Sequence, residues 1–324
     1  MTQGGISQTL VRRTNLEENR SLKRLKSRYK VEDTLTRFLL GFSVVLIVLI
    51  FVIILTTIFI GGYQKITWDF LTGAPEKGMT EGGIFPGIIG TVLLVLVMSI
   101  FCIPVGVITA IYLSEYANKE SYFYKIVYFS ISTLAGIPGI ILGLFGLSFF
   151  VITLGGTIDN LFYGGKLTWG KPALIWAGLT MAVLTMPVVI VSVKEALESV
   201  PETLKEAAFS LGATKYETVF KVVLPRAMTG VLTGSILAVS RGSGEVAPIL
   251  FTGVAYYLPY LPSSLTDQFM ELGYHIYIMA TQSVDVDATM PIQFGTTLVL
   301  LVLTFMLNLF AIFLRGRLRK TKNI

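Results

Sequence analysis

Two ionisable residues, Arg241 and Glu245, lie four positions apart inside a long apolar stretch of this 324-residue chain. Charged side chains are costly within a bilayer, so they face a protein interior or a wet cavity and mark functional sites. A guanidinium stays charged and presents a planar fork of donors, which suits an oxyanion such as phosphate. Arg241 is therefore predicted to bind an anion, and Glu245 to neutralise it in part while the site is empty.

The same spacing also fits a purely structural ion pair, because oppositely charged residues at i, i+4 stabilise a helix anywhere. Ser240 and Ser243 fit both interpretations, since small residues allow close helix packing and their hydroxyls can donate to an oxyanion. A helix that begins near Ala227 places Arg241 about 21 Å along it, beyond the membrane midplane. The sequence leaves the two interpretations open.

The composition indicates that a bilayer is the main solvent of the chain. Hydrophobic residues make up 53% and charged residues 14%, with a mean hydropathy of +0.72, far too apolar for an ordinary soluble domain. A transmembrane helix needs about 20 mostly apolar residues. The predicted fold is an all-α membrane protein whose six transmembrane helices cover residues 38–60, 84–113, 126–154, 172–193, 227–253 and 292–314.

Glycine and proline are frequent in the four middle stretches. The third contains Gly136, Pro138, Gly139, Gly143 and Gly146. Such residues let helices approach closely or break inside a bundle. The middle helices are therefore expected to build a pathway, although generic tight packing explains any single glycine as well.

Basic residues are distributed unevenly between the two sides of the membrane. If the N-terminus is cytoplasmic, 21 of the 26 Lys and Arg residues lie in cytoplasmic segments, as the positive-inside rule requires. Both termini are therefore predicted to be cytoplasmic, and no nucleic-acid partner is needed to explain the net charge of +6. Residues 1–37 form a basic arm, either an amphipathic helix on anionic headgroups or a solvated tail, and residues 315–324 form a basic tail.

Several kinds of site are not expected in this chain. Cys102 and His275 are each the only residue of their type, so one copy can build neither a disulfide nor a His/Cys metal cluster. Lys166 follows two glycines but precedes Leu167 and lacks the upstream glycine of a phosphate-binding loop. If ATP drives this protein, another chain binds it. No cofactor or metal is expected, and a membrane enzyme is disfavoured because the other helices offer only hydroxyls.

The polar segment between the fourth and fifth stretches has the pattern helix, turn, helix. Residues 202–210 are predicted to form the first helix, Gly212 a left-handed turn, and residues 215–223 a second helix that stops before Pro225. Apolar residues line one face of the first helix, which predicts a groove on a partner. These residues are Leu204, Ala207, Ala208 and Leu211.

This loop resembles the EAA loop of ABC importer permeases. The matching residues are Glu206, Ala207, Ala208, Gly212, Leu224 and Pro225. The resemblance implies a type I, MetI-like permease architecture for residues 84–314, with coupling helices in segment 195–225 that enter a cleft on a separate ATPase subunit. It also implies a transport subunit that is not itself an enzyme.

Four other segments resemble the PstA family of phosphate permeases: TEGGI at 80–84, IPVGVITAIYLSEYA at 103–117, AGIPGIILGLFG at 135–146 and LAVSRGSGEVAPILFTG at 237–253. Two residues depart from the family pattern, Gly139 where Ser is frequent and Val246 where Thr is common. Alternatives are a permease for another oxyanion or the paralogous PstC-type subunit. Segment 247–250, with the sequence APIL, favours PstA.

The family resemblance also implies partners and a location. These are a second, PstC-like permease, a PstB-like ATPase dimer and an extracytoplasmic, PstS-like phosphate-binding protein, in a bacterial or archaeal cytoplasmic membrane. Segment 254–291 is predicted to be an outer loop, rich in Tyr and without Lys or Arg. It suits either docking of the binding protein or an interfacial aromatic belt.

Overall fold

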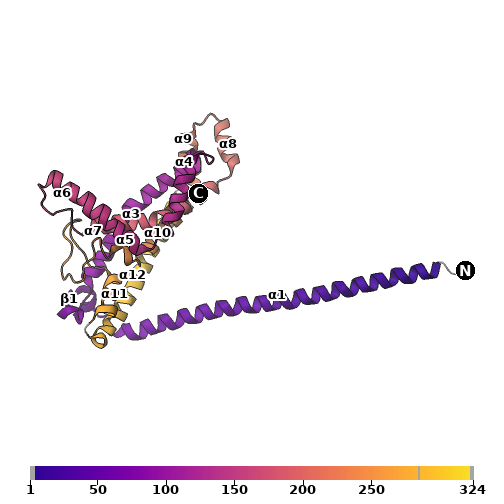
Figure 1. The fold of residues 1–324 in the computed structure, drawn as a ribbon, viewed down its shortest axis with the longest axis horizontal. Helices are drawn as coiled ribbons and strands as arrows, with labels where there is room; N and C mark the ends of the chain where they lie inside the picture. Colours follow the sequence, from indigo (N-terminus) through magenta and orange to yellow (C-terminus); the bar gives the residue numbers. More distant parts are fainter. Residues whose placement is uncertain (1–3, 284, 322–324) are drawn as a thin grey trace. The chain divides into compact units, whose positions relative to one another are not determined.

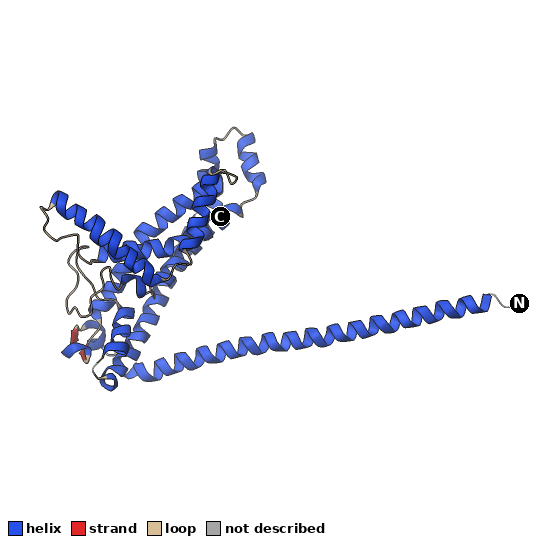
Figure 2. Ribbon diagram, viewed as in Figure 1, coloured by secondary structure: helices blue, strands red, loops and turns tan. Residues whose placement is uncertain are grey.

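The computed structural model of the chain describes residues 4–283 and 285–321, with side chains from residue 33 onward apart from 284, 314, 315 and 318–321. Almost all of the described regular structure is helical (Figure 2). The strands β1 (Pro75–Glu76) and β2 (Glu81–Gly82) pair antiparallel. The chain divides into two compact units, residues 1–58 and 59–324.

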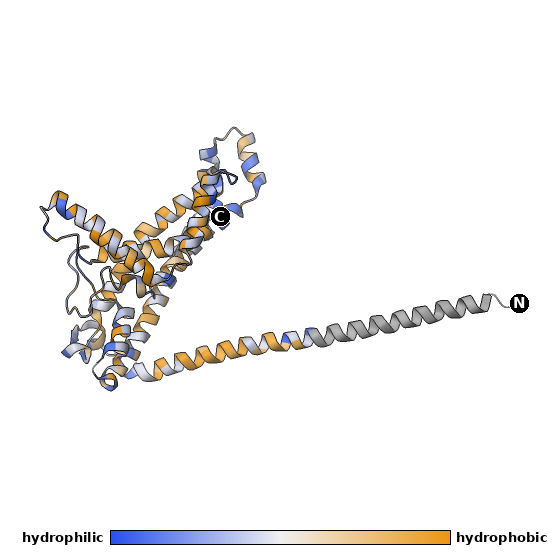
Figure 3. Ribbon diagram, in the orientation of Figure 1, coloured by the Kyte–Doolittle hydropathy of each residue, from blue (hydrophilic) through white to orange (hydrophobic). Residues whose placement is uncertain are grey.

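Six helical stretches among the described residues are long and apolar enough to cross a membrane, which confirms the predicted all-α membrane fold. Their apolar character is visible in Figure 3. Most lie close to the predicted positions, but the third is displaced and the fifth ends early. The stretches are Asp33–Lys65, Phe85–Tyr116, Gly139–Phe162, Leu174–Glu198, Lys215–Gly242 and Val286–Phe313.

The first stretch belongs to α1 (Gly4–Gly62), a single helix that also includes most of the predicted basic arm. Residues 1–3 and the side chains of residues 4–32 lie outside the described part of the structure. The two interpretations of the arm therefore stay predictions. From residue 38 to 60 the helix is apolar around its whole circumference, as expected for a helix that faces lipid.

Three long helices form the centre of the second unit: α3 (Phe85–Ile111), α7 (Leu174–Glu198) and α10 (Leu224–Gly242). Small residues bring them together, because a Cβ on Gly106 would lie 2.8 Å from Val189 and one on Gly234 would lie 2.8 Å from Ser192. Their shared core includes Met98 and Met181, both fully buried. The predicted close packing through glycine is confirmed at these positions.

The third predicted stretch is broken, not continuous. α4 (Tyr122–Leu134) ends before Pro138, and α5 (Gly139–Gly146) begins directly after it. Proline lacks an N–H and disfavours helical backbone in the residue before it, which explains the break. The helix then continues through η4 (Leu147–Gly155), which is π-helical, and α6 (Gly156–Phe162).

Shorter elements complete the second unit. The hairpin helices α8 and α9 lie at one end of it, and β1 and α11 lie at the other (Figure 1). Their bounds, with the remaining elements, are η1 (Tyr63–Lys65), α2 (Trp68–Thr72), η2 (Lys77–Met79), η3 (Tyr112–Tyr116), α8 (Glu202–Ser210), α9 (Lys215–Glu217), η5 (Thr218–Val223), η6 (Ala247–Ile249), α11 (Leu272–Gln282) and α12 (Val286–Thr321).

Candidate functional site

Helix α10 ends half-way along its neighbours. Its last residue, Gly242, packs directly against the sulfur of Met98 and lies near Thr185. Met98 is 13 residues from each end of α3, and Thr185 is close to the centre of α7. The prediction that a helix continues to residue 253 is wrong, and Arg241 lies next to the residue that contacts the middle of α3 and α7.

Local sequence explains why the helix stops here. Ser243 and Gly244 are poor helix formers, and Pro248 would clash with the carbonyl of Gly244 in a continued helix. The chain instead runs through two turns and the short η6. Pro248 was the signal in the sequence that the fifth helix is shorter than its apolar run.

The irregular segment 243–252 packs on the glycine face of α5. A Cβ on Gly139 would lie 3.3 Å from the Pro248 ring, and one on Gly143 would lie 3.0 Å from the carbonyl oxygens of Ala247 and Pro248. Gly146 packs in the same way against Thr180 and Thr252. Non-helical backbone at membrane depth is tolerated where protein surrounds it, and these glycines let α5 approach it closely.

The charged pair bridges the end of α10. The Arg241 Nε lies 3.6 Å from Glu245 Oε1, and the two side chains are 40% and 34% exposed. Glu245 lies past the end of the helix, so the i, i+4 spacing does not place the pair within one helix. A long, part-exposed ion pair contributes little to stability. In the described part of the chain no other acceptor engages the Arg241 guanidinium, so its donors are available to a ligand.

The two predicted pathway serines contact α12. Asn308 donates from Nδ2 to Ser240 Oγ at 3.2 Å, and Ser243 Oγ donates to the Ser240 carbonyl at 3.1 Å. Ser243 is buried and also lies 3.5 Å from the Thr304 hydroxyl. The serines therefore join α10 to α12 beside Arg241. Sequence analysis missed Asn308 and Thr304, although two polar residues four apart in an apolar stretch are a signal of such a seam.

The loop between α7 and α10 has the predicted first helix and turn. α8 covers Glu202–Ser210, and Gly212 has φ +83, the left-handed conformation that favours glycine. Thr214 then caps α9 through a reciprocal capping box with Glu217.

The second helix of this loop does not stop before Pro225, so that prediction is wrong. It passes through the π-helical η5 into α10, and Pro225 lies in the first turn of α10. Proline has no N–H to donate to the helical hydrogen-bond ladder. The π-helical turn directly before it already interrupts the regular ladder, so Pro225 lies where the hydrogen-bond pattern is irregular. α9, η5 and α10 thus form one stretch from Lys215 to Gly242.

The surface of the loop is open to a partner. Glu206, Ala207 and Gly212 are exposed, and Leu211 is 89% exposed. Ala208 is half-buried, as are Leu224 and Pro225 at the start of α10. Leu204 turns inward and packs against the core. The predicted apolar face of α8 is therefore divided between the core and the open surface.

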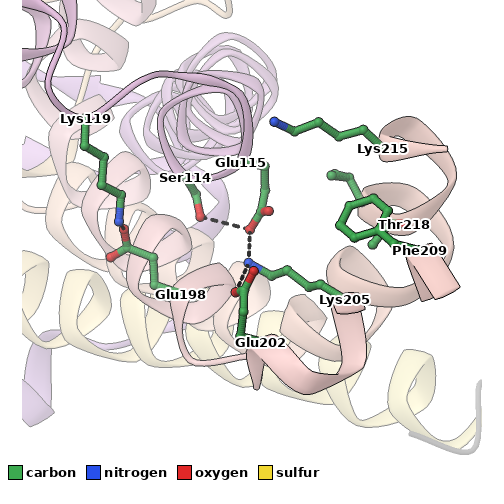
Figure 4. A pocket seen from close by; sticks show the side chains of 10 residues that line it. Ser114, Glu115, Lys119, Glu198, Glu202, Lys205, Phe209, Lys215 and Thr218 are labelled. Atoms are coloured by element: carbon green, nitrogen blue, oxygen red, sulfur yellow. Dashed lines mark hydrogen bonds and ion pairs between the residues drawn. The ribbon is translucent and has the colours of Figure 1, made fainter. Parts of the chain in front are cut away.

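A cavity of about 580 Å³ lies between this loop and the end of α3 (Figure 4). Lys205 Nζ lies 3.1 Å from Glu115 Oε1 and 3.2 Å from Glu202, and Lys119 pairs with Glu198 at 2.8 Å. Burial lowers the pKa of Lys205, but its hydrogen bonds to Glu115 and Glu202 raise it more, so the net direction is upward. The pairs Lys205–Glu115 and Lys119–Glu198 could not be predicted from the sequence, because their residues are 90 and 79 positions apart.

A buried carboxyl lies in segment 254–291, which was predicted to be an outer loop. Glu271 is 3% exposed, and its oxygens accept from the N–H groups of Gly273 at 2.8 Å and Tyr274 at 2.6 Å. Burial raises the pKa of Glu271 to about 7, although these two hydrogen bonds lower it. The Leu272 N–H donates to the Thr91 hydroxyl of α3 at 3.1 Å. This part of the segment therefore belongs to the core.

Comparison with known proteins identifies the family. Residues 102–321 match the model of the binding-protein-dependent transport system inner membrane component. The chain belongs to this family. Over 295 residues, 87% of this chain and 94% of the relative, it is 30% identical to the probable ABC transporter permease protein YqgI of Bacillus subtilis. Over 230 residues, 70% of each chain, it is 30% identical to phosphate transport system permease protein PstA 1 of Mycobacterium tuberculosis.

Solved structures give the same fold. The chain superposes on a bacterial alginate ABC transporter in complex with an alginate-bound periplasmic protein with a TM-score of 0.60 and 15% identity, covering 85% of this chain and 93% of that one. The MetNI methionine ABC transporter gives a TM-score of 0.53 and 18% identity, covering 72% and 94%. The type I, MetI-like ABC importer fold and the PstA-like permease resemblance are thereby confirmed. The chain is a multi-pass permease subunit of an ABC transporter.

Proposed function

We propose that this permease translocates inorganic phosphate across the bacterial cytoplasmic membrane, driven by ATP hydrolysis on a separate subunit. The observation that carries the proposal is Arg241, which lies next to the residue that contacts the middle of α3 and α7, with its guanidinium engaged only by Glu245 among the described residues. The similarity to PstA proteins of M. tuberculosis and Yersinia pestis, 30% and 33% identical, supports phosphate as the anion.

The site is suited to weak, reversible binding. Arg241 can donate two parallel hydrogen bonds to a tetrahedral oxyanion. Glu245 and the carbonyls at the end of α10 place negative charge beside the anion, which opposes tight binding. A transporter must release its substrate, and the negative charge beside the site lowers the affinity for the anion enough to permit release. When the site is empty, Glu245 holds the guanidinium in place.

The loop residues Glu206, Ala207, Ala208 and Gly212 are proposed to meet the ATPase, and Leu224 and Pro225 to anchor the loop to α10. The open surface of α8 supports this role. The 21 Lys and Arg residues in the segments assigned to the cytoplasm support cytoplasmic placement of this loop and of both termini. A PstC-like permease, a PstB-like ATPase dimer and a PstS-like binding protein complete the proposed complex, in which this chain forms half of the pathway.

The test is transport by the complete complex in proteoliposomes. Phosphate uptake that depends on ATP and on the binding protein is expected, and excess sulfate should compete poorly. Sulfate uptake at the same rate, or uptake of another oxyanion alone, would assign the complex to that anion instead.

A further inference from the structure

We propose that the ion pair between Lys205 of α8 and Glu115 at the end of α3 is the joint through which the ATPase moves the transmembrane helices. This inference rests on the proposed function, because it requires α8 to meet an ATPase. The two residues are 90 positions apart in the chain. Glu115 belongs to η3, the π-helical extension of α3, and Figure 4 shows Lys205 reaching it across the cavity.

The geometry of the pair distinguishes it from the surface ion pairs of this protein. The side chains of Lys205 and Glu115 are only 13% and 7% exposed, and the Ser114 hydroxyl also donates to Glu115 at 3.2 Å. Removing Lys205 would leave the part-buried Glu115 carboxylate without its cation, which makes the contact costly to break. By contrast, Lys221 and Glu217 of the same loop form a pair that is 71% and 40% exposed.

A mechanical joint is needed because α8 is otherwise attached mainly to its own hairpin. It packs on η5, and Leu204 is its residue that packs against the core. Its connections are a proline, Pro201, on one side and the left-handed Gly212 on the other. A displacement of α8 is therefore transmitted to α3 most directly through Lys205.

α3 connects this joint to the charged pair as one helix with Pro104 inside it. Met98 lies 17 residues before Glu115, about 26 Å along a helix, and it contacts Gly242 beside Arg241. Close behind the joint, Lys119 pairs with Glu198 at the end of α7, and Gly106 of α3 packs closely on Val189 of α7. The π-helical turn at residues 112–116 lies at the junction, and such turns occur frequently at functional sites.

The experiment measures phosphate transported per ATP hydrolysed, using the complete complex in proteoliposomes. Glu115→Gln and Lys205→Met should lower this ratio about tenfold, within the usual range of coupling between sites, while Lys205→Arg keeps most of it. The matched control is Lys221→Met, which removes the exposed pair of the same loop and should keep the parental ratio. A parental ratio in both Glu115→Gln and Lys205→Met would overturn the proposal.

A double variant, Glu115→Gln with Lys205→Met, separates a joint from a merely structural pair. It leaves no buried unpaired charge, so assembly should be normal even if the single variants assemble poorly. If the pair transmits motion, the double variant should show normal assembly and normal basal ATPase activity, but transport little phosphate per ATP hydrolysed. A structural pair predicts that the ratio recovers with assembly, which would refute the inference. If the parental complex itself fails to transport phosphate, the proposed function is wrong instead.

Discussion

Gly242, the last residue of α10, packs against the Met98 sulfur at the middle of α3. This contact sets how closely the two helices approach beside Arg241. A methyl group at position 242 would collide with the end of the buried Met98 side chain, which would have to move, whereas a Cβ on Gly244 would meet nothing within 4 Å.

We therefore expect Gly242→Ala to destabilise the permease by about 1–3 kcal/mol, the usual cost of overpacking. Thermal unfolding of the detergent-solubilised protein measures the effect. Gly244→Ala is the matched control and should unfold at nearly the parental temperature. Shortening the opposing side chain, in Gly242→Ala with Met98→Ala, should relieve the collision. Equal unfolding temperatures for Gly242→Ala and Gly244→Ala would contradict this account of the contact.

Arg241 and Glu245 can be tested by exchanging their charges. If Arg241 binds the anion, both Arg241→Gln and the swap Arg241→Glu with Glu245→Arg should abolish phosphate uptake while assembly persists. The swap places a carboxylate where an anion must pass, and repulsion is strong in a partly desolvated site. Glu245→Gln should retain some uptake. Uptake is normalised to the assembled complex recovered from the membrane, and uptake restored by the swap would show a purely structural pair.

Gly212 provides a test of the proposed coupling role of its loop. Its φ of +83 is unfavourable for a branched residue, although the surrounding space is open. Gly212→Val should therefore cost about 1–2 kcal/mol in the turn and misalign α8, with loss of ATPase binding or of transport. Gly212→Asn is the control, because Asn tolerates left-handed backbone. Co-purification of the ATPase with each variant gives the result, and parental behaviour of the valine variant would exclude a role for the turn.

Glu271 predicts a pH-dependent stability. Its pKa is raised to about 7 in the folded protein from an ordinary value of 4.5, so the folded state binds more protons between these values. Stability is then greatest at low pH and falls as pH rises through about 7. Burial lowers the pKa of His275 to about 4, so this neighbour stays neutral in the window.

The unfolding temperature of the parental protein should therefore fall between pH 5 and pH 8. Glu271→Gln keeps an acceptor for the helix cap and removes the titration, so its unfolding temperature should depend less on pH. A His275→Gln variant should keep the parental profile. The same slope in Glu271→Gln as in the parent would assign the pH dependence to another group.

The proposal that a separate subunit binds ATP can be tested by a binding measurement. The sequence contains no glycine-rich phosphate-binding loop followed by Lys and Ser or Thr, so the purified chain alone should not bind ATP. Equilibrium binding of a fluorescent ATP analogue is expected only after addition of the ATPase subunit. Binding by the isolated permease at an affinity like that of the complex would contradict the assignment.

Local patterns in the sequence predicted that a bilayer surrounds the protein, and they predicted most of its membrane helices and the first helix and turn of the loop between α7 and α10. Each of these depends on neighbouring residues: a run of about 20 apolar residues spans a bilayer, and Gly212 follows a short amphipathic helix. The bounds 202–210 and the family motif from Glu206 to Pro225 could therefore be predicted. The sequence also shows that Arg241 and Glu245 are the charged residues of the fifth predicted stretch.

Tertiary structure decided the rest, because it depends on which distant residues meet. Hydropathy continues past Gly242, so only Pro248 and the glycine face of α5 reveal that the helix ends there. The Lys205–Glu115 pair joins residues 90 positions apart, and no periodicity predicts it. Glu271 appeared to lie in a polar outer loop, yet its packing beside α3 buries it. Burial and pairing of charges are set by packing between elements, and one-dimensional patterns do not contain that information.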